Sequence, residues 1–156
     1  MPVQIKIDLL KNRVQLGALT VLDGAGNILT GPIDALGKAD NASAAARGNS
    51  TRDPVLSFGD TPTGKYRGFV NPLARTPIND RKYGPQSIIS LDPVSGQAKT
   101  AKENGRFGLL IHGGDLNAAG RLRPTFGCVR VANASMVAIL ASVPAAERID
   151  VVVTET

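Results

Sequence analysis

The segment Val3-Gln4-Ile5-Lys6-Ile7-Asp8-Leu9 alternates apolar and polar side chains with a period of two. This period is typical of a β-strand that buries one side and exposes the other. The apolar stretch 18–22 follows, then Asp23-Gly24-Ala25-Gly26-Asn27, whose residues accept positive φ angles, then residues 28–30. We therefore predict that the chain opens as a β-meander with a hairpin turn at 23–27.

Further strands are predicted along the rest of the chain. Apolar segments occur at 65–70, 87–91 and 107–112, and loops containing Pro and Gly separate them, notably at 71–85. The Val-rich segment 149–153 is continuously apolar enough to predict a strand at the centre of a sheet. These patterns favour a mainly β fold.

Helices play a small part in the predicted fold. Asn133 is a candidate cap for a helix over 135–142, and Pro144 should stop this helix. Its apolar side would carry Met136, Ile139, Leu140 and Val143. We predict a surface loop at 33–53, with room for a short helix at 42–47. The expectation is one or two short helices in all.

Composition agrees with a β fold in one domain. The chain has 156 residues, 42% of them hydrophobic, with 17 Gly, 10 Pro and only 4% aromatic residues. This length fits a single domain, 1–156, and the many Gly and Pro residues suit short strands and turns better than a helical bundle. Residues 1–11 do not resemble a signal peptide, and no run of 18 apolar residues occurs, so we expect no membrane insertion.

The chain has one cysteine, Cys128, and one histidine, His112. A single cysteine excludes an internal disulfide, and one residue of each type argues against a zinc site, so we expect no metal and no cofactor. By type alone, a lone Cys is more often an inert buried thiol and a lone His more often a structural residue. Their flanking residues favour chemistry instead.

His112 ends the apolar run 107–111 and precedes Gly113-Gly114, and sixteen residues further on Cys128 lies in Thr125-Phe126-Gly127-Cys128-Val129-Arg130. The glycines permit close approach of backbone or substrate and a sharp turn at the cysteine. A thiol nucleophile needs a base, and a neighbouring cation lowers its pKa. A base, a thiol and an arginine are the parts of a Cys–His acyl-transfer site, and we predict that the imidazole lies within roughly 3–5 Å of the sulfur.

The segment Gly59-Asp60-Thr61-Pro62-Thr63-Gly64-Lys65 has the glycine and lysine spacing of a phosphate-binding loop. However, Tyr66 replaces the Ser or Thr that would hold magnesium, and Pro62 removes a backbone N–H that would contact phosphate. We predict a turn that leads into a strand, and we exclude nucleotide binding.

The motifs around His112 and Cys128 resemble the signature of the L,D-transpeptidase catalytic domain: a His-Gly, a spacer, then Ser/Thr-x-Gly-Cys-x-Arg. Thr61-Pro62-Thr63-Gly64-Lys65-Tyr66 is similar to a Thr-Pro-x-Gly-x-aromatic segment of the same family. The resemblance extends from about Val3 to Val153. It implies a β-sandwich-like fold and an enzyme that cuts or rebuilds the peptide stems of bacterial peptidoglycan without a cofactor.

The resemblance also implies residue roles. Cys128 would attack the amide after the L-centre of diaminopimelate as the nucleophile, and His112 would be the general base, oriented by the carbonyl of Gly113. Backbone N–H groups around Gly127 and Cys128 would form the oxyanion hole. The remaining assignments are loop support by Thr125, a fixed turn or a substrate carboxylate for Arg130, and a place in the substrate site for Gly114 and Phe126.

Phe126 departs from the family pattern, because family members very often carry a second histidine directly before Gly-Cys. We expect the chemistry to survive, since this position is not the general base. The Phe126 ring would wall the thiol and raise its pKa by desolvation, whereas Arg130 and a protonated His112 would lower it, so the sequence leaves the direction of the net shift open.

Three functions remain open from the sequence. The first is a Cys-dependent acyltransferase or carboxypeptidase of the cell envelope or periplasm. The second is a secreted antibacterial effector with the same chemistry, for which an immunity protein would be a partner; it is indicated by the start at Met1 without an export signal. The third is an inactive peptidoglycan-binding module, indicated by Phe126.

Charge agrees with an anionic partner such as the peptidoglycan stems. The net charge is +5, and basic residues are in excess in two segments that flank the predicted site, 65–82 and 106–130. We expect no nucleic-acid partner, because no aromatic platform is interleaved with these charges.

Overall fold

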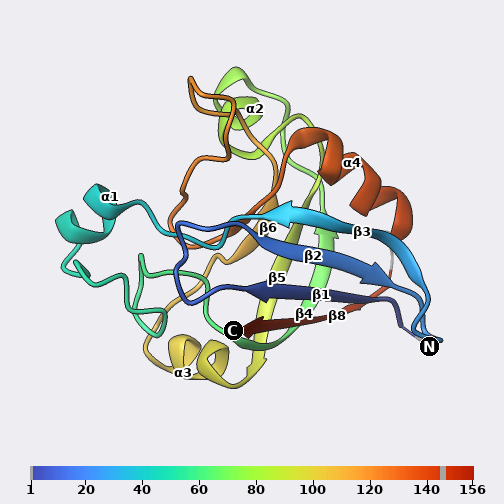
Figure 1. The fold of residues 1–156 in the computed structure, drawn as a ribbon, viewed down its shortest axis with the longest axis horizontal. Helices are drawn as coiled ribbons and strands as arrows, with labels where there is room; N and C mark the ends of the chain where they lie inside the picture. Colours follow the sequence, from blue (N-terminus) through green and yellow to red (C-terminus); the bar gives the residue numbers. More distant parts are fainter. Residues whose placement is uncertain (1, 145–146) are drawn as a thin grey trace.

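A computed structural model describes residues 2–144 and 147–156 of the chain. The described residues form one eight-stranded sheet in the order β3-β2-β1-β8-β4-β5-β6-β7 (Figure 1). The strands are β1 (Gln4–Leu9), β2 (Gly17–Leu22), β3 (Ile28–Ala35), β4 (Gly64–Asn71), β5 (Ile88–Ser95), β6 (Leu110–His112), β7 (Val129–Arg130) and β8 (Ile149–Glu155). The prediction of a mainly β fold is confirmed.

The first three strands form the predicted meander. β1 pairs antiparallel with β2, and β2 pairs antiparallel with β3. The turn between β2 and β3 closes through a hydrogen bond from Asp23 N to Asn27 O of 2.9 Å. The Asp23 carboxylate also accepts hydrogen bonds from the backbone N–H groups of Ala25 and Asn27, each of 2.9 Å, so the side chain itself shapes the hairpin.

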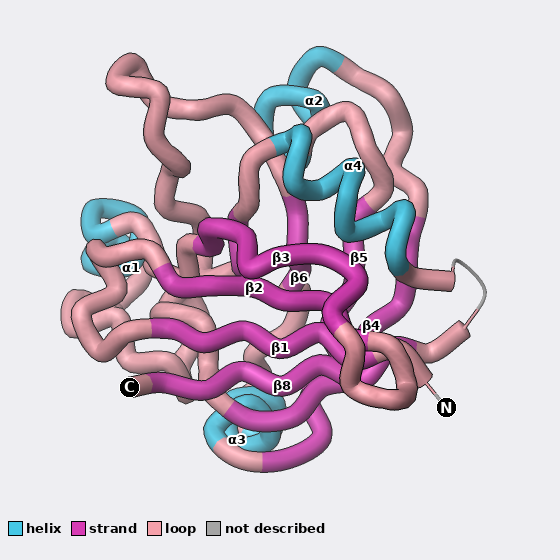
Figure 2. The backbone as a smooth tube through the Cα atoms, turned by 45° about the vertical axis from the view of Figure 1, so that its right-hand side comes forward, coloured by secondary structure: helices cyan, strands magenta, loops and turns pink. Residues whose placement is uncertain are grey.

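The sheet bends over itself and encloses the core. Figures 1 and 2 show β3, β2, β1 and β8 running side by side, with β4 and β5 crossing behind them at a steep angle. Leu36, directly after β3, exchanges two backbone hydrogen bonds of 2.9 Å with Arg130 of β7. The two edge strands of the sheet therefore meet, and the sheet is nearly closed.

The Val-rich strand β8 is central, as its sequence predicts. It lies between β1, to which it is parallel, and β4, to which it is antiparallel. Ile149, Val151 and Val153 are buried in the core. Because β1 and β8 come from opposite ends of the chain, their pairing joins the N- and C-terminal segments in one sheet.

The described residues contain four short helices, so the expectation of one or two was wrong. They are α1 (Asn41–Ala46), α2 (Pro77–Tyr83), α3 (Gln97–Glu103) and α4 (Asn133–Ser142). In the predicted loop at 33–53, α1 lies where the sequence left room for a short helix at 42–47, and the first residues of the segment belong to the end of β3. Helix α2 lies within the predicted loop at 71–85, where the Thr76 side chain caps it by accepting a hydrogen bond from Asn79 N. None of the helices is long and apolar enough to cross a membrane in the described part of the chain.

Helix α4 has the predicted apolar side but not the predicted cap. Met136, Ile139 and Val143 are buried, and Leu140 packs against the core. The N-cap is Ala132, without a side-chain hydrogen bond, and Asn133 is the first helical residue. The Asn133 side chain is occupied elsewhere, because its Oδ1 accepts a hydrogen bond of 2.9 Å from Gly114 N.

Strand β6 is shorter than the predicted strand at 107–112. It begins only at Leu110, and Phe107 is 92% exposed. Gly108 has a φ of +80°, a value that favours glycine and interrupts extended backbone. This segment therefore contributes a strand of only three residues, which ends at His112.

Candidate active site

The pairing of β6 with β7 places the predicted base beside the strand that follows the predicted nucleophile. These strands are parallel, with Ile111 opposite Val129 and His112 opposite Arg130. Cys128 directly precedes the two-residue strand β7, so its backbone lies next to that of β6. The register thus brings the backbone segments of the two residues together, and the predicted 3–5 Å separation of the imidazole and the sulfur stays a prediction.

His112 is held in one orientation by two contacts. Its side chain is 2% exposed, and Nδ1 lies 2.6 Å from the carbonyl oxygen of Gly113. Since a carbonyl oxygen can only accept, Nδ1 carries the proton and Nε2 keeps its lone pair. The ring of Tyr83 packs edge-on against the imidazole, with centroids 5.0 Å apart and planes at 77°.

Burial keeps this imidazole neutral. Desolvation lowers the pKa of His112 to about 4, the hydrogen bond with Gly113 opposes this effect, and the charge of Arg130 adds to it. At neutral pH the side chain is therefore a free base with an unprotonated Nε2.

Cys128 is also neutral at rest. Its side chain is 9% exposed, and Sγ donates a hydrogen bond of 3.6 Å to Gly108 O. Burial raises the pKa of the thiol to about 11, although the Leu110 backbone N–H, Arg106 and Arg130 lower it. The direction that the sequence left open is thus upward, because desolvation outweighs the nearby cations.

The turn that carries Cys128 is built from Thr125, Gly127 and Thr61. Thr125 Oγ1 accepts from Gly127 N at 3.0 Å and donates to Cys128 O at 3.1 Å, and Thr61 Oγ1 donates to Gly127 O at 2.6 Å. Gly127 has a φ of +105°, and an added Cβ would overlap the Arg106 guanidinium and the Gly59 carbonyl oxygen. A glycine is therefore required there.

This hydrogen bonding corrects the predicted oxyanion hole. The Gly127 N–H already binds Thr125 Oγ1 and is not free for a substrate. Among the described residues, no acceptor is found for the Cys128 N–H. The oxyanion role of the Cys128 N–H stays a prediction.

Arg130 fixes the backbone around the site. It is buried, and its guanidinium donates to the carbonyl oxygens of Gly113 (3.2 Å), Arg123 (3.3 Å) and Lys82 (2.5 Å). Two roles were predicted for Arg130, to fix the turn or to bind a substrate carboxylate. The contacts in the structure are those of a residue that fixes the turn. A Cβ on Gly114, whose φ is +134°, would overlap this guanidinium and the Lys82 carbonyl oxygen, so packing requires a glycine there, and the place of Gly114 in the substrate site stays a prediction.

Helix α2 supports the segment that follows His112. Three consecutive carbonyl groups at its C-terminal end, those of Arg81, Lys82 and Tyr83, accept hydrogen bonds from Asp115 N (2.8 Å), the Arg130 guanidinium and Gly113 N (3.1 Å). The sequence analysis missed Tyr83 and this helix. The signal that was present is the Thr76-Pro77 pair, a cap followed by a proline in the first turn.

Phe126 lies at the surface of the site. It is 56% exposed, and its ring packs edge-to-face against Phe58, with centroids 5.5 Å apart and planes at 76°. The Arg47 guanidinium lies 4.9 Å from the centroid of Phe58. Phe126 and Phe58 therefore form an aromatic pair beside the cysteine turn.

One further expectation concerns the charge at the surface. Arg106 and Arg130 belong to the basic segment 106–130, but both are buried and so add little charge to the surface around the site. A groove of about 880 Å³ borders the site without including Cys128 or His112, and it is lined by Ile33, Leu36, Lys38, Leu122, Pro124 and others.

No group of three or more His, Cys, Asp or Glu side chains that could hold a metal ion occurs in residues 2–144 and 147–156.

Comparisons with known proteins identify relatives by fold. The chain matches no family model and no curated protein sequence. A variant of the helical cell shape determining protein Pgp2 from Campylobacter jejuni aligns over 99% of this chain with 18% identity and a TM-score of 0.59. Bd1075 from Bdellovibrio bacteriovorus aligns over 95% with 16% identity and a TM-score of 0.55. These likenesses show a shared fold.

The aligned proteins are longer than this chain. It spans 48% of the Pgp2 chain and 46% of the Bd1075 chain. An L,D-transpeptidase from Mycobacterium smegmatis aligns over 98% of this chain and 58% of its own at 14% identity, with a TM-score of 0.44 that is too low to establish a common fold.

Proposed function

We propose that this protein is a cysteine acyltransferase that acts on peptidoglycan peptide stems in the cell envelope, with the chemistry of an L,D-transpeptidase or L,D-carboxypeptidase. Two observations support the proposal most directly: the β6–β7 pairing, which brings the segments of His112 and Cys128 side by side, and the contact of His112 Nδ1 with Gly113 O. The motif resemblance around both residues and the fold shared with a cell shape determining protein also support it.

The neutral resting pair defines the first step. Because the thiol and the imidazole are both uncharged at neutral pH, the thiolate forms only as His112 Nε2 takes the proton from Sγ. The sulfur then bonds to the carbonyl carbon of the stem amide. The resulting oxyanion accepts a hydrogen bond from the Cys128 N–H.

Collapse of this intermediate breaks the carbon–nitrogen bond. His112 returns its proton to the departing amine of the D-amino acid, and a thioester remains on Cys128. An amine of a second stem or a water molecule then attacks the thioester carbon and gives its proton to His112. The carbon–sulfur bond breaks, and the thiolate recovers the proton from the imidazole.

Mass spectrometry of purified tetrapeptide muropeptides after incubation with the protein tests the proposal. Trimming to tripeptide, exchange of the terminal D-amino acid or crosslinking is the expected result, together with a thioester adduct on Cys128. A correctly folded protein that leaves tetrapeptide and pentapeptide stems unchanged would contradict the proposal and favour a binding module.

A further inference from the structure

Arg106 is a buried arginine directly behind the cysteine turn. It is 4% exposed and lies between α3 and β6. Its Nη1 donates to Pro54 O at 2.5 Å and to Asp60 O at 3.0 Å, and its Nη2 donates to Gly59 O at 2.7 Å and to Phe126 O at 3.3 Å. One guanidinium thus joins the 54–60 loop to the turn that carries Cys128.

The charge of Arg106 has no paired carboxylate. In the described part of the chain, no acidic side chain forms a salt bridge with it. Its acceptors are four neutral carbonyl groups. A guanidinium remains protonated in proteins, so the site contains a buried positive charge beside a thiol.

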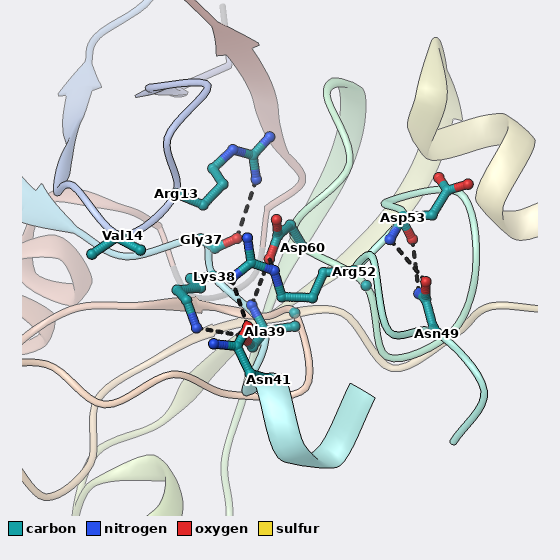
Figure 3. Close-up of polar contacts among 12 residues, drawn as sticks. Arg13, Val14, Gly37, Lys38, Ala39, Asn41, Asn49, Arg52, Asp53 and Asp60 are labelled. Carbon is teal, nitrogen blue, oxygen red and sulfur yellow. Dashed lines mark hydrogen bonds and ion pairs between the residues drawn. The ribbon is translucent and has the colours of Figure 1, made fainter. Parts of the chain in front are cut away.

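The loop that holds Arg106 is itself fixed by hydrogen bonds (Figure 3). Ala39 N donates to Asp60 Oδ1 at 2.8 Å, and Arg52 forms an ion pair with the same carboxylate at 3.6 Å. Asn49 bridges the backbone of Asp53, with Oδ1 accepting from its N–H and Nδ2 donating to its carbonyl oxygen. The Gly59 and Asp60 carbonyl groups are therefore set in place to receive the guanidinium.

The approach of Arg106 to the cysteine also explains Gly127. The Nη2 atom occupies the space that a Cβ at position 127 would take. Among the charges that lower the pKa of the Cys128 thiol, Arg106 has a larger effect than Arg130. Arg106 thus lies against the turn, and its charge acts on the Cys128 thiol.

We propose that Arg106 is a positioning residue of the Cys128 site: its guanidinium pins the Phe126–Cys128 turn and supplies the buried positive charge that stabilises the Cys128 thiolate. This inference rests on the proposed function, in which that thiolate is the nucleophile. No bond of Arg106 to substrate is involved, because all four of its contacts are to the protein backbone.

The test measures the reactivity of Cys128, the single cysteine of the chain, in Arg106→Gln and Arg106→Lys. Two neutral reagents of different size are used at pH 8, iodoacetamide and methyl methanethiosulfonate. Below its pKa, the thiolate fraction falls tenfold for each unit by which that pKa rises. We expect Arg106→Gln to slow both reagents by the same factor, about fivefold or more, and Arg106→Lys to slow them about twofold or less because the charge remains.

Arg13→Lys is the matched control. Arg13 is also buried and also binds backbone carbonyl oxygens, those of Gly37 (3.1 Å) and Thr61 (2.9 Å), but it pairs with Glu155. This variant should lower the melting temperature and leave both alkylation rates unchanged. A structural role of Arg106 alone would give the same result as this control.

Wild-type alkylation rates in folded Arg106→Gln, or a loss that differs between the two reagents, would overturn the inference. If Arg106→Gln does not fold, Arg106→Lys decides: its lysine lacks the fork that binds four carbonyl groups, so kcat should fall about tenfold with little change in KM. Wild-type kcat in Arg106→Lys would overturn the inference. Absence of muropeptide turnover in the wild type would contradict the proposed function, whereas the alkylation rates test Arg106 independently of turnover.

Discussion

His112 and Arg130 share one acceptor, the carbonyl oxygen of Gly113, which lies 2.6 Å from His112 Nδ1 and 3.2 Å from Arg130 Nε. The two residues are also opposite each other in the β6–β7 pair. Arg130 therefore holds the group that orients the imidazole, and its charge helps to lower the pKa of that imidazole. The base depends on the arginine although the two side chains need not touch.

Arg130→Met should weaken both the fold and the turnover. The change leaves the carbonyl groups of Gly113, Arg123 and Lys82 without their donor in a buried region, which should cost on the order of 3 kcal/mol of unfolding free energy. Because the Gly113 carbonyl loses one of its two anchors, kcat should fall about tenfold or more. Urea denaturation and muropeptide kinetics measure the two effects.

Arg123→Met is the control for that experiment. The Arg123 side chain is exposed, and only its backbone carbonyl contacts Arg130. This variant should keep wild-type stability and turnover. Equal losses in the two variants would show that net charge, rather than the fixed turn, explains the effect.

Cys128→Ala and His112→Ala should each reduce muropeptide turnover by about a thousandfold or more while preserving the fold. Removal of either a nucleophile or its base eliminates acyl transfer through the thioester, and such losses are not additive in the double variant. Turnover assays with circular dichroism as the fold control provide the measurement. Wild-type turnover in either single variant would place the chemistry at another site.

The buried neutral His112 predicts a loss of stability in mild acid. Its folded-state pKa, about 4, lies below its ordinary value of 6.5, so the unfolded chain binds more protons between these values. The free energy of unfolding should therefore increase as the pH rises from about 4 to 6.5. The same contribution, on the order of 3 kcal/mol, disappears when the pH falls through this window.

Urea denaturation of wild type and His112→Gln at several pH values between 4 and 7.5 isolates this contribution. The variant should lack the histidine-dependent part of the decline, since glutamine does not titrate. Parallel curves for the two proteins would mean that His112 does not have a lowered pKa in the folded state.

Local sequence patterns predict the parts of the fold whose cause is local. The period of two in β1, the Val run of β8 and the Asp23–Asn27 turn each determine their own structure. Helix α3 gives almost no signal, because only Ala98 and Ala101 are buried among its exposed residues. Two alanines do not form a recognisable apolar side, because a helical period is recognised from larger apolar residues that recur every three or four positions.

The residues of the candidate site also differ in whether their cause is local in the sequence. His112 and Cys128 follow from motifs of adjacent residues, whereas the burial of Arg106 depends on carbonyl groups between 46 and 52 residues earlier in the chain and on Phe126, 20 residues later. A charged residue in a loop is usually exposed, so its type predicts the opposite of what the structure shows. Such contacts depend on the path of the whole backbone.

Phe126→His tests whether this aromatic residue shapes the substrate site or marks an inactive one. The ring is half exposed and packs on Phe58, so an imidazole fits in its place without disturbing the core. If Phe126 shapes the site, the variant should remain active and change the ratio of tetrapeptide to pentapeptide turnover severalfold, because a polar ring replaces an apolar one beside the scissile bond. Phe69→His, the same change at a partly exposed phenylalanine on β4, is the control and should leave the ratio unchanged.

An inactive wild type and an inactive Phe126→His, both folded, would identify a binding module. An unchanged ratio in an active Phe126→His would show that the ring does not contact the stem.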